Sequence, residues 1–239
     1  MNIEVSLSPA LYPFRTLTQH HTTVAIDLLR ATTAVCAAFQ AGCNSVIPLS
    51  SLDELPHYRS LGYQIAAERG GSKVGDAEYG NSPTEYLRND MTGKNLAYST
   101  TNGTISILCA ADAELTLVGS FANLSTLCER LYLDKRDVVL LCSGWKNDFC
   151  IEDTLVAGAI IEKMMQITSQ VTLLNDASQM AMAMWQVAKE APFDYCQRCT
   201  HVHRLYGLGA KADVEFAFRQ DTCPVIPVFN NGILTLLNR

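Results

Sequence analysis

The chain has 239 residues, a formal net charge of −6 at pH 7 and a pI of about 5.3. Its charges of both signs are scattered, which excludes the broad basic surface of a nucleic-acid-binding protein, and it has no apolar run of bilayer-spanning length. The first residues do not resemble a signal peptide, and the nine cysteines are an odd number with several inside apolar runs. We therefore expect reduced thiols, a cytoplasmic location, and neither a nucleic-acid nor a membrane partner.

A local pattern recurs along the chain, in which a strand-like run passes through a polar turn into a helical stretch. In chain order the strand-like runs cover residues 22–27, 44–49, 94–99, 113–120 and 137–144. This alternation predicts an α/β fold with a mostly parallel, mixed sheet and helices packed on both faces. Because no linker divides the chain, we expect residues 1–239 to form one unit, with two subdomains as the alternative.

The first of these runs ends in an acid, Asp27, and Arg30 follows three residues later. Ligands of parallel sheets bind beyond the carboxyl ends of the strands, so the residues that follow each strand are the candidates for a site. Thr32 and Thr33 come next, in a helical stretch of small residues. This position therefore combines an acid, a base and two hydroxyl groups.

The longest stretch without clear periodicity covers residues 68–87, and loops of this length inside a compact domain are often functional. It contains Arg69 beside two glycines, which is an arrangement suited to a phosphate or a sulfonate. An exposed loop arginine is the alternative interpretation. We also expect Ser82 to cap a helix that begins at Pro83.

The segment STTNGT, residues 99–104, lies between a strand-like run and a helix start. Backbone N–H groups at the start of a helix favour an anion, and a glycine lets the anion approach closely. The same residue types are also the usual helix caps, so capping remains the alternative interpretation. The candidates here are Ser99, Thr100, Thr101, Asn102 and Gly103.

The segment CSGWKNDFCIED, residues 142–153, follows the last strand-like run. Ser143 lies in its turn, and Glu152 and Asp153 are adjacent acids at the next helix start, where the helix dipole explains one of them. Together with Asp27, the two acids would form an oxygen-rich site suited to Mg²⁺. We interpret Cys142 as a packed thiol, because the phosphate loop of cysteine phosphatases does not surround it.

The segment CQRCTHVH offers Cys196, Cys199, His201 and His203 as zinc ligands. A single Cys-x-x-Cys pair is a weak signal, and two histidines spaced two apart on a helix point away from each other. We therefore do not expect a zinc site in this segment.

Taken in order, four motifs resemble those of the 2-phosphosulfolactate phosphatase family, the ComB-like proteins. They are AIDLLRATT, ERGG followed by GNSPTEY, STTNGT, and CSGWKNDFCIEDTLVAG. The resemblance extends from about Val24 to Asp213, and the segment RLYGLGAKADVEFAFRQDTCPVIPV is similar to the family's C-terminal part. It implies a Mg²⁺-dependent hydrolase that converts 2-phospho-3-sulfolactate to 3-sulfolactate and phosphate, a step of coenzyme M biosynthesis. Residues 201–204 depart from the family pattern, which leaves the physiological substrate open.

The resemblance also suggests roles for the candidate residues. Asp27, Glu152 and Asp153 would hold Mg²⁺ directly or through waters, with one of the two helix acids as an alternative general base. Arg30 would neutralise phosphate oxygens, and Arg69 would bind the sulfonate or carboxylate. The remaining donors to the small anionic substrate would be Thr32, Thr33, Ser99, Thr100, Thr101, Asn102, Gly103 and Ser143.

Alternatives remain open at the level of mechanism and function. We expect direct attack by water rather than an Asp27 phospho-enzyme, because the sequence lacks the Asp-x-Asp pair of haloacid-type phosphatases. The competing functions are a phosphatase for another small phosphorylated hydroxy acid and a non-catalytic anion-binding module. A pure anion binder would gain nothing from three nearby carboxylates. A homodimer is the default oligomeric state.

Overall fold

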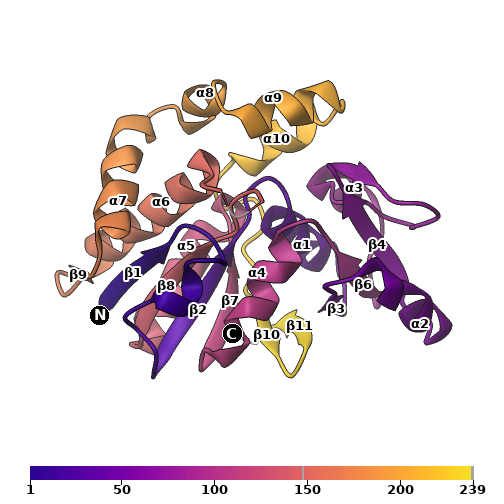
Figure 1. Cartoon of the computed structure of the whole chain (residues 1–239), viewed down its shortest axis with the longest axis horizontal. Coiled ribbons are helices and arrows are strands. Elements are labelled where there is room, and N and C mark those ends of the chain that lie inside the picture. Colours follow the sequence, from indigo (N-terminus) through magenta and orange to yellow (C-terminus); the bar gives the residue numbers. More distant parts are fainter. Residues whose placement is uncertain (147, 238–239) are drawn as a thin grey trace.

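The structure is a computed structural model that describes residues 1–146 and 148–237. Within these residues, eleven strands form one sheet in the order β5-β4-β6-β3-β11-β10-β7-β2-β8-β1-β9. Most neighbouring strands are parallel, and helices pack against the sheet (Figure 1). The predicted α/β fold with a mixed, mostly parallel sheet is therefore confirmed.

The sheet contains two parallel blocks joined by a C-terminal hairpin. The larger block consists of β1 (Asn2–Ser6), β2 (His21–Ile26), β7 (Leu115–Gly119), β8 (Asp137–Cys142) and β9 (Thr172–Leu173). The smaller consists of β3 (Ser45–Pro48), β4 (Gln64–Arg69) and β6 (Asn95–Ser99), with β5 (Ser72–Lys73) antiparallel at its edge. The hairpin of β10 (Pro227–Asn230) and β11 (Ile233–Leu236) lies between β7 and β3 and pairs with both in antiparallel fashion.

The hairpin reverses the strand direction, so β4 runs opposite to β2 when the two are followed along the sheet. Six steps separate these strands in the sheet order. The usual twist of roughly 20–25° per step accumulates over six steps to about 120–150°. The carboxyl ends of β2 and β4 consequently lie at one place, where the Arg30 side chain donates a 2.7 Å hydrogen bond to the Gly71 carbonyl.

Helices cover both faces of the larger block. The helices of the chain are α1 (Ala31–Gln40), α2 (Leu55–Ser60), α3 (Pro83–Arg88), α4 (Gly103–Cys109), α5 (Leu124–Asp134), α6 (Ile151–Ile167), α7 (Asp176–Ala188), α8 (Pro192–Cys196), α9 (Thr200–Gly207) and α10 (Lys211–Ala217). In β8, Val138 and Leu140 belong to the core under α5, α6 and α7, whereas Val139 and Leu141 belong to a separate cluster with Ala110. Burial on both faces explains why β8 is apolar throughout instead of alternating.

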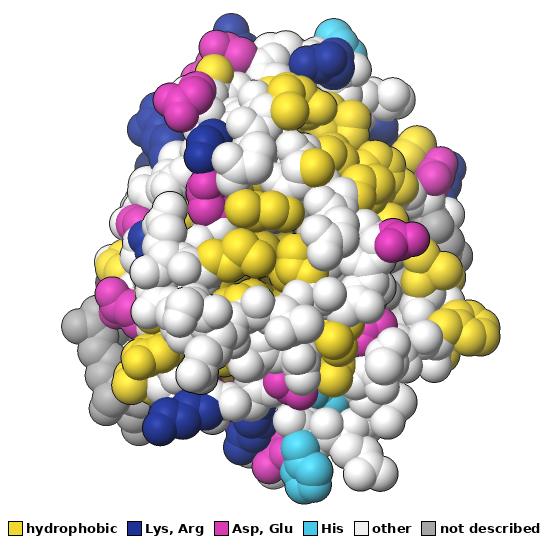
Figure 2. Space-filling model, turned by 90° about the vertical axis from the view of Figure 1, so that its left-hand side faces the viewer, with side chains coloured by type: hydrophobic (Ala, Val, Ile, Leu, Met, Phe, Trp, Pro, Cys, Tyr) yellow, Lys and Arg dark blue, Asp and Glu magenta, His cyan; other side chains and the backbone are white. Residues whose placement is uncertain are grey.

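The close packing of α6 against α7 depends on a glycine. A Cβ atom at Gly158 would overlap the Ala181 carbonyl oxygen and the Trp185 side chain, so the two helices approach each other where only glycine fits. Figure 2 looks at the side of the molecule that carries α7, and apolar side chains gather in a band across this face. Among the described helices, none combines the length and the hydrophobicity needed to cross a membrane.

Strands β2, β3, β6, β7 and β8 lie at or within two residues of the predicted runs. Strand β4 was not predicted, because its last two residues, Glu68 and Arg69, were assigned to the long irregular loop. The predicted cap is present, since the Ser82 hydroxyl accepts a 3.2 Å hydrogen bond from the Glu85 N–H at the start of α3.

Candidate active site

A pocket opens where the ends of β2, β4 and β6 meet α9. Its lining includes Asp27, Glu68, Thr101 and Asn102 from the strand ends, and His201 and Arg204 from α9. Its two acids, Asp27 and Glu68, are buried, as is Arg30, which also lines the pocket. The sequence elements that meet here are far apart in the chain, as expected for a site beyond the carboxyl ends of strands.

Asp27 is one of the two acids that line this pocket. Its carboxylate accepts a 3.2 Å hydrogen bond from the Ala31 N–H. Burial raises the pKa of Asp27 to about 6, with smaller raising contributions from Glu68 and Glu152, while His201 and the Ala31 N–H act against the shift. The Asp27 carboxylate therefore lies in a poorly solvated place where a cation would stabilise its charge.

Gly103 permits this arrangement. A Cβ atom at position 103 would lie 2.7 Å from Oδ2 of Asp27 and would overlap the side chain of Ala31. The predicted role of this glycine was to let an anion approach. In the structure it makes room for the Asp27 carboxylate at the start of α4.

Thr32 and Thr33 stiffen the turn between β2 and α1. The Thr32 hydroxyl donates a 2.8 Å hydrogen bond to the Asp27 carbonyl and accepts a 3.0 Å bond from the Asp27 N–H. The Thr33 hydroxyl donates to the Leu28 carbonyl at 2.9 Å and lies 3.1 Å from the Ser120 hydroxyl. In the described part of the chain neither threonine lines the pocket. Their contacts hold Asp27 in position.

The two adjacent acids of α6 differ in what they contact. Both oxygens of Asp153 accept backbone hydrogen bonds, one from the Leu28 N–H at 2.9 Å and one from the Gly144 N–H at 3.0 Å. The carboxyl group thus ties the turn after β2 to the turn after β8. Burial, together with the nearby Asp27 and Glu152, raises the pKa of Asp153 well above its usual range.

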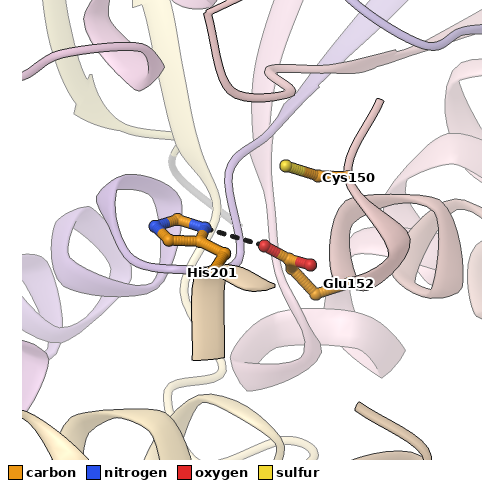
Figure 3. Close-up of side chains that lie close together, drawn as sticks. All are labelled: Cys150, Glu152 and His201. Atoms are coloured by element: carbon orange, nitrogen blue, oxygen red, sulfur yellow. Dashed lines mark hydrogen bonds and ion pairs between the residues drawn. The ribbon is translucent and has the colours of Figure 1, made fainter. Parts of the chain in front are cut away.

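Glu152 instead faces α9. Its Oε1 lies 2.8 Å from Nδ1 of His201, and both side chains are largely shielded from solvent (Figure 3). The His201 ring stacks on Trp145, with centroids 6.4 Å apart and 16° between the ring planes. The carboxylate and the indole together fix the orientation of the imidazole.

Arg30 lines the pocket while bound to groups at its edge. Its Nη1 donates a 2.8 Å hydrogen bond to Oδ2 of Asp213, and the pair is buried. The other oxygen of Asp213 accepts hydrogen bonds of 2.6 Å from the hydroxyls of Ser82 and Thr84. This network connects the turn after β2 to α3 and α10.

Glu68 and Arg69 have opposite environments at the end of β4. Of the two, the structure places Glu68 in the pocket lining and Arg69 outside it. The buried Glu68 accepts a 3.1 Å hydrogen bond from the Thr101 hydroxyl and another from the Gly71 N–H. Arg69 donates to the Ser99 hydroxyl at 2.9 Å. The turn runs through Gly70 and Gly71, whose φ values of 63° and 87° favour glycine.

The other predicted donors divide between the pocket and its support. The Thr100 hydroxyl accepts a 3.2 Å hydrogen bond from the Thr104 N–H, which is a capping contact, whereas Asn102 lines the pocket. Ser143 donates its N–H to the Ile26 carbonyl at 2.7 Å, and its buried hydroxyl finds no partner among the described residues. Some of the predicted donors therefore cap a helix or support the turns, as the alternative interpretation expected, and others line the pocket.

Several pocket residues did not stand out in the sequence. Glu68, Trp145, Arg204 and the supporting Asp213 carry no local motif that separates them from ordinary loop and helix residues. His201 was considered only as a zinc ligand with His203, and the two do lie on different sides of α9, since His203 is exposed. The departure of residues 201–204 from the family pattern was the available signal.

Comparison with known proteins now identifies the family. A family model described as 2-phosphosulpholactate phosphatase matches residues 7–232. The chain belongs to this phosphatase family. A relative from Thermotoga petrophila, named probable 2-phosphosulfolactate phosphatase, is 33% identical over 215 residues, which cover 90% of this chain and 92% of the relative. Relatives with the same name are 32% identical in Thermotoga maritima, over 90% and 92% of the two chains, and 32% identical in Gloeothece citriformis, over 86% and 87%.

The resemblance seen in the ordered motifs is thus confirmed, and the family name is that of phosphoric monoester hydrolases. The matched residues include the turns after β2, β4, β6 and β8 as well as α9. The pocket described above therefore lies entirely within the part of the chain that the family shares.

Proposed function

We propose that this protein hydrolyses 2-phospho-3-sulfolactate to 3-sulfolactate and phosphate with the help of Mg²⁺. The observation that supports the proposal is one pocket that contains the buried carboxylates of Asp27 and Glu68 together with the guanidinium groups of Arg30 and Arg204. A dianionic phosphate that also carries a carboxylate and a sulfonate needs several cationic partners, and protein carboxylates are useful there only if a metal cation joins them.

The donor set fits Mg²⁺. This ion prefers oxygen ligands and usually takes one or two carboxylates together with phosphate oxygens and waters. Asp27 and Glu68 are the carboxylates of the pocket lining, and the raised pKa of Asp27, due first to burial, is consistent with a position that a cation would neutralise. When bound, Mg²⁺ would supply charge neutralisation at the phosphoryl oxygens.

The contacts of Glu152 and Asp153, the two acids of α6, favour roles other than direct binding of Mg²⁺. Asp153 has both oxygens bonded to backbone N–H groups, so its role is to position the turns that carry Asp27 and Ser143. Glu152 is paired with His201, which makes the two residues a candidate for proton transfer.

The chain's own residues would act on the substrate in three ways. Arg30 and Arg204, whose guanidinium groups both lie beside Gly71, bind its anionic oxygens. His201, oriented through Nδ1 by Glu152, takes the proton of the attacking water at Nε2. The water oxygen forms the new bond to phosphorus as the P–O bond to the hydroxy acid breaks on the opposite side; the departing oxygen takes a proton from solvent, and His201 afterwards returns its proton to solvent, so that atoms and charge balance.

The test is a phosphate-release assay with and without Mg²⁺ on the wild type and on Asp27→Asn. We expect release only with Mg²⁺, and a loss of about 10²–10⁴-fold in the variant. Asp76→Asn is the matched control, because its side chain is 92% exposed and is not among the residues that line the pocket. Unchanged release by Asp27→Asn, with its fold intact by circular dichroism, would remove Asp27 from the mechanism.

The same assay separates substrates and mechanisms. Faster release from phosphosulfolactate than from phospholactate or phosphoglycolate is expected if Arg204 or a neighbouring cation binds the sulfonate. An acid-labile phosphate trapped on Asp27 would replace direct water attack by a phospho-enzyme. The homodimer and the cytoplasmic location stay predictions from the sequence.

A further inference from the structure

A thiol lies beside the Glu152–His201 pair and has no part in the proposed reaction. The ligand atoms of Cys150, Glu152 and His201 all lie within 4.8 Å of one another, and this is the one such group of three among the described residues (Figure 3). In Figure 3 the sulfur of Cys150 is directed toward the space beside the contact between Glu152 and His201.

We propose that Cys150, Glu152 and His201 form a binding site for Zn²⁺. One sulfur, one ring nitrogen and one carboxylate oxygen match the ligands that zinc takes, and the thiolate disfavours Mg²⁺. Zinc–ligand bond lengths place neighbouring donors about 3.5 Å apart in a tetrahedral site. The Cys150 sulfur would need to approach the other two donors by roughly 1 Å, whereas Glu152 Oε1 and His201 Nδ1, which are 2.8 Å apart, would need to separate by roughly 0.5 Å as the ion enters between them, and a fourth position remains for water.

The charges and the access also fit a dication. The Cys150 thiol would release its proton to solvent when zinc binds. The thiolate and the Glu152 carboxylate then neutralise the two positive charges. A cavity of about 300 Å³ that Cys150, Glu152 and His201 line together with Phe149 offers a route from solvent.

This site is separate from the zinc pattern considered in the sequence. Cys199 also lines the cavity, but it lies outside the group of three, and His203 is exposed on the other side of α9. Because zinc would occupy the Glu152–His201 pair, it would also inhibit phosphate release. That consequence rests on the proposed function, whereas the binding of zinc does not.

Titration of the metal-free protein with Co²⁺ tests the binding site without an activity assay. We expect one equivalent of Co²⁺ to give a near-ultraviolet thiolate-to-cobalt charge-transfer band. Zn²⁺ should displace the cobalt and abolish the band, whereas excess Mg²⁺ should not. The band should disappear in Cys150→Ala, and Zn²⁺ affinity should fall about 100-fold in this variant and in His201→Phe, which keeps a ring against Trp145. Cys199→Ala and His203→Ala are the matched controls and should retain both the charge-transfer band and the wild-type affinity for Zn²⁺.

Loss of the band in Cys199→Ala with retention in Cys150→Ala would overturn the assignment, as would an unchanged band in all variants or displacement by Mg²⁺. A phosphate-release assay forms the second arm, with activity measured for each protein with and without Zn²⁺. We expect Zn²⁺ to inhibit the wild type at least tenfold more than Cys150→Ala. Zinc binding without any phosphatase activity would contradict the proposed function and leave the zinc site standing.

Discussion

The floor and the roof of the pocket are built in different ways. The floor, which comprises the turn 27–33 and the start of α6, is braced by short-range and backbone contacts, such as those of Thr32 and Asp153. The roof, which is α9, presents His201 and Arg204 from a partly exposed helix held through side chains. We therefore expect substitutions in the floor to lower the stability of the fold more than substitutions in the roof.

The largest effect is expected when the ion pair between Arg30 in the floor and Asp213 in α10 is removed. Arg30→Gln leaves Asp213 as a buried, unpaired carboxylate, so we expect the free energy of unfolding to fall by about 3–5 kcal/mol. Urea unfolding measures this, and the double variant Arg30→Gln/Asp213→Asn should recover part of the loss. If the losses of unfolding free energy in the single variants Arg30→Gln and Asp213→Asn simply add up in the double variant, the two side chains are not energetically coupled.

Removal of the Asp153 carboxyl group comes next. Asp153→Ala leaves the N–H groups of Leu28 and Gly144 without their acceptors, which should cost about 2–4 kcal/mol in urea unfolding. Asp153→Asn keeps one acceptor oxygen and should lose less. If the two variants were equally stable, the hydrogen bonds would not explain the role of this acid.

The third prediction concerns the cost of a buried charge in the floor. The pKa of Asp27, raised to about 6 chiefly by burial, lies above its ordinary value of 3.8. Its contribution therefore favours the fold at low pH and is lost as the pH rises through about 6. In the presence of EDTA, Asp27→Asn should be more stable than the wild type by about 1–3 kcal/mol at pH 8.

Near pH 3 the difference in unfolding free energy between Asp27→Asn and the wild type should be small, because the carboxyl group is then mostly neutral in both the folded and the unfolded state. A variant that is less stable than the wild type at both pH values would contradict the inference that burial destabilises the charged form of Asp27.

The smallest effect is expected in the roof. Arg204→Ala removes a guanidinium that lies 5.3 Å above the Trp145 ring and lines the pocket. We expect KM to rise about tenfold while kcat changes by less than about threefold, and the unfolding free energy should change by no more than about 1 kcal/mol. Arg198→Ala, at an exposed arginine that packs on Tyr195, is the control. If the unfolding free energy of Arg204→Ala fell as much as that of the floor variants, the roof would contribute as much to stability as the floor.

Local patterns in the sequence were sufficient for the alternation of strands and helices and for the positions of the candidate acids. Strand β8 is recognisable because both of its faces are buried, and Asp27 because it follows an apolar strand directly. These patterns could not show which of two adjacent residues faces the pocket. Glu68 and Arg69 are adjacent on a strand, so their side chains point to opposite sides, and the sequence does not say which side holds the pocket.

The same limit applies to Glu152 and Asp153. Successive residues of a helix are rotated by about 100°, so one acid reaches His201 while the other turns back to the backbone of Leu28 and Gly144.

The sequence by itself determined the fold class, the family and the strand ends at which the site lies, because periodicity, turn residues and ordered motifs are local properties of the chain. Only the tertiary structure decided that Arg30 pairs with Asp213, which is 183 positions away, and that Cys150 and Glu152 meet His201. Such contacts depend on the twist of the sheet and on the path of α8 to α10 over the pocket. No local pattern specifies either of them.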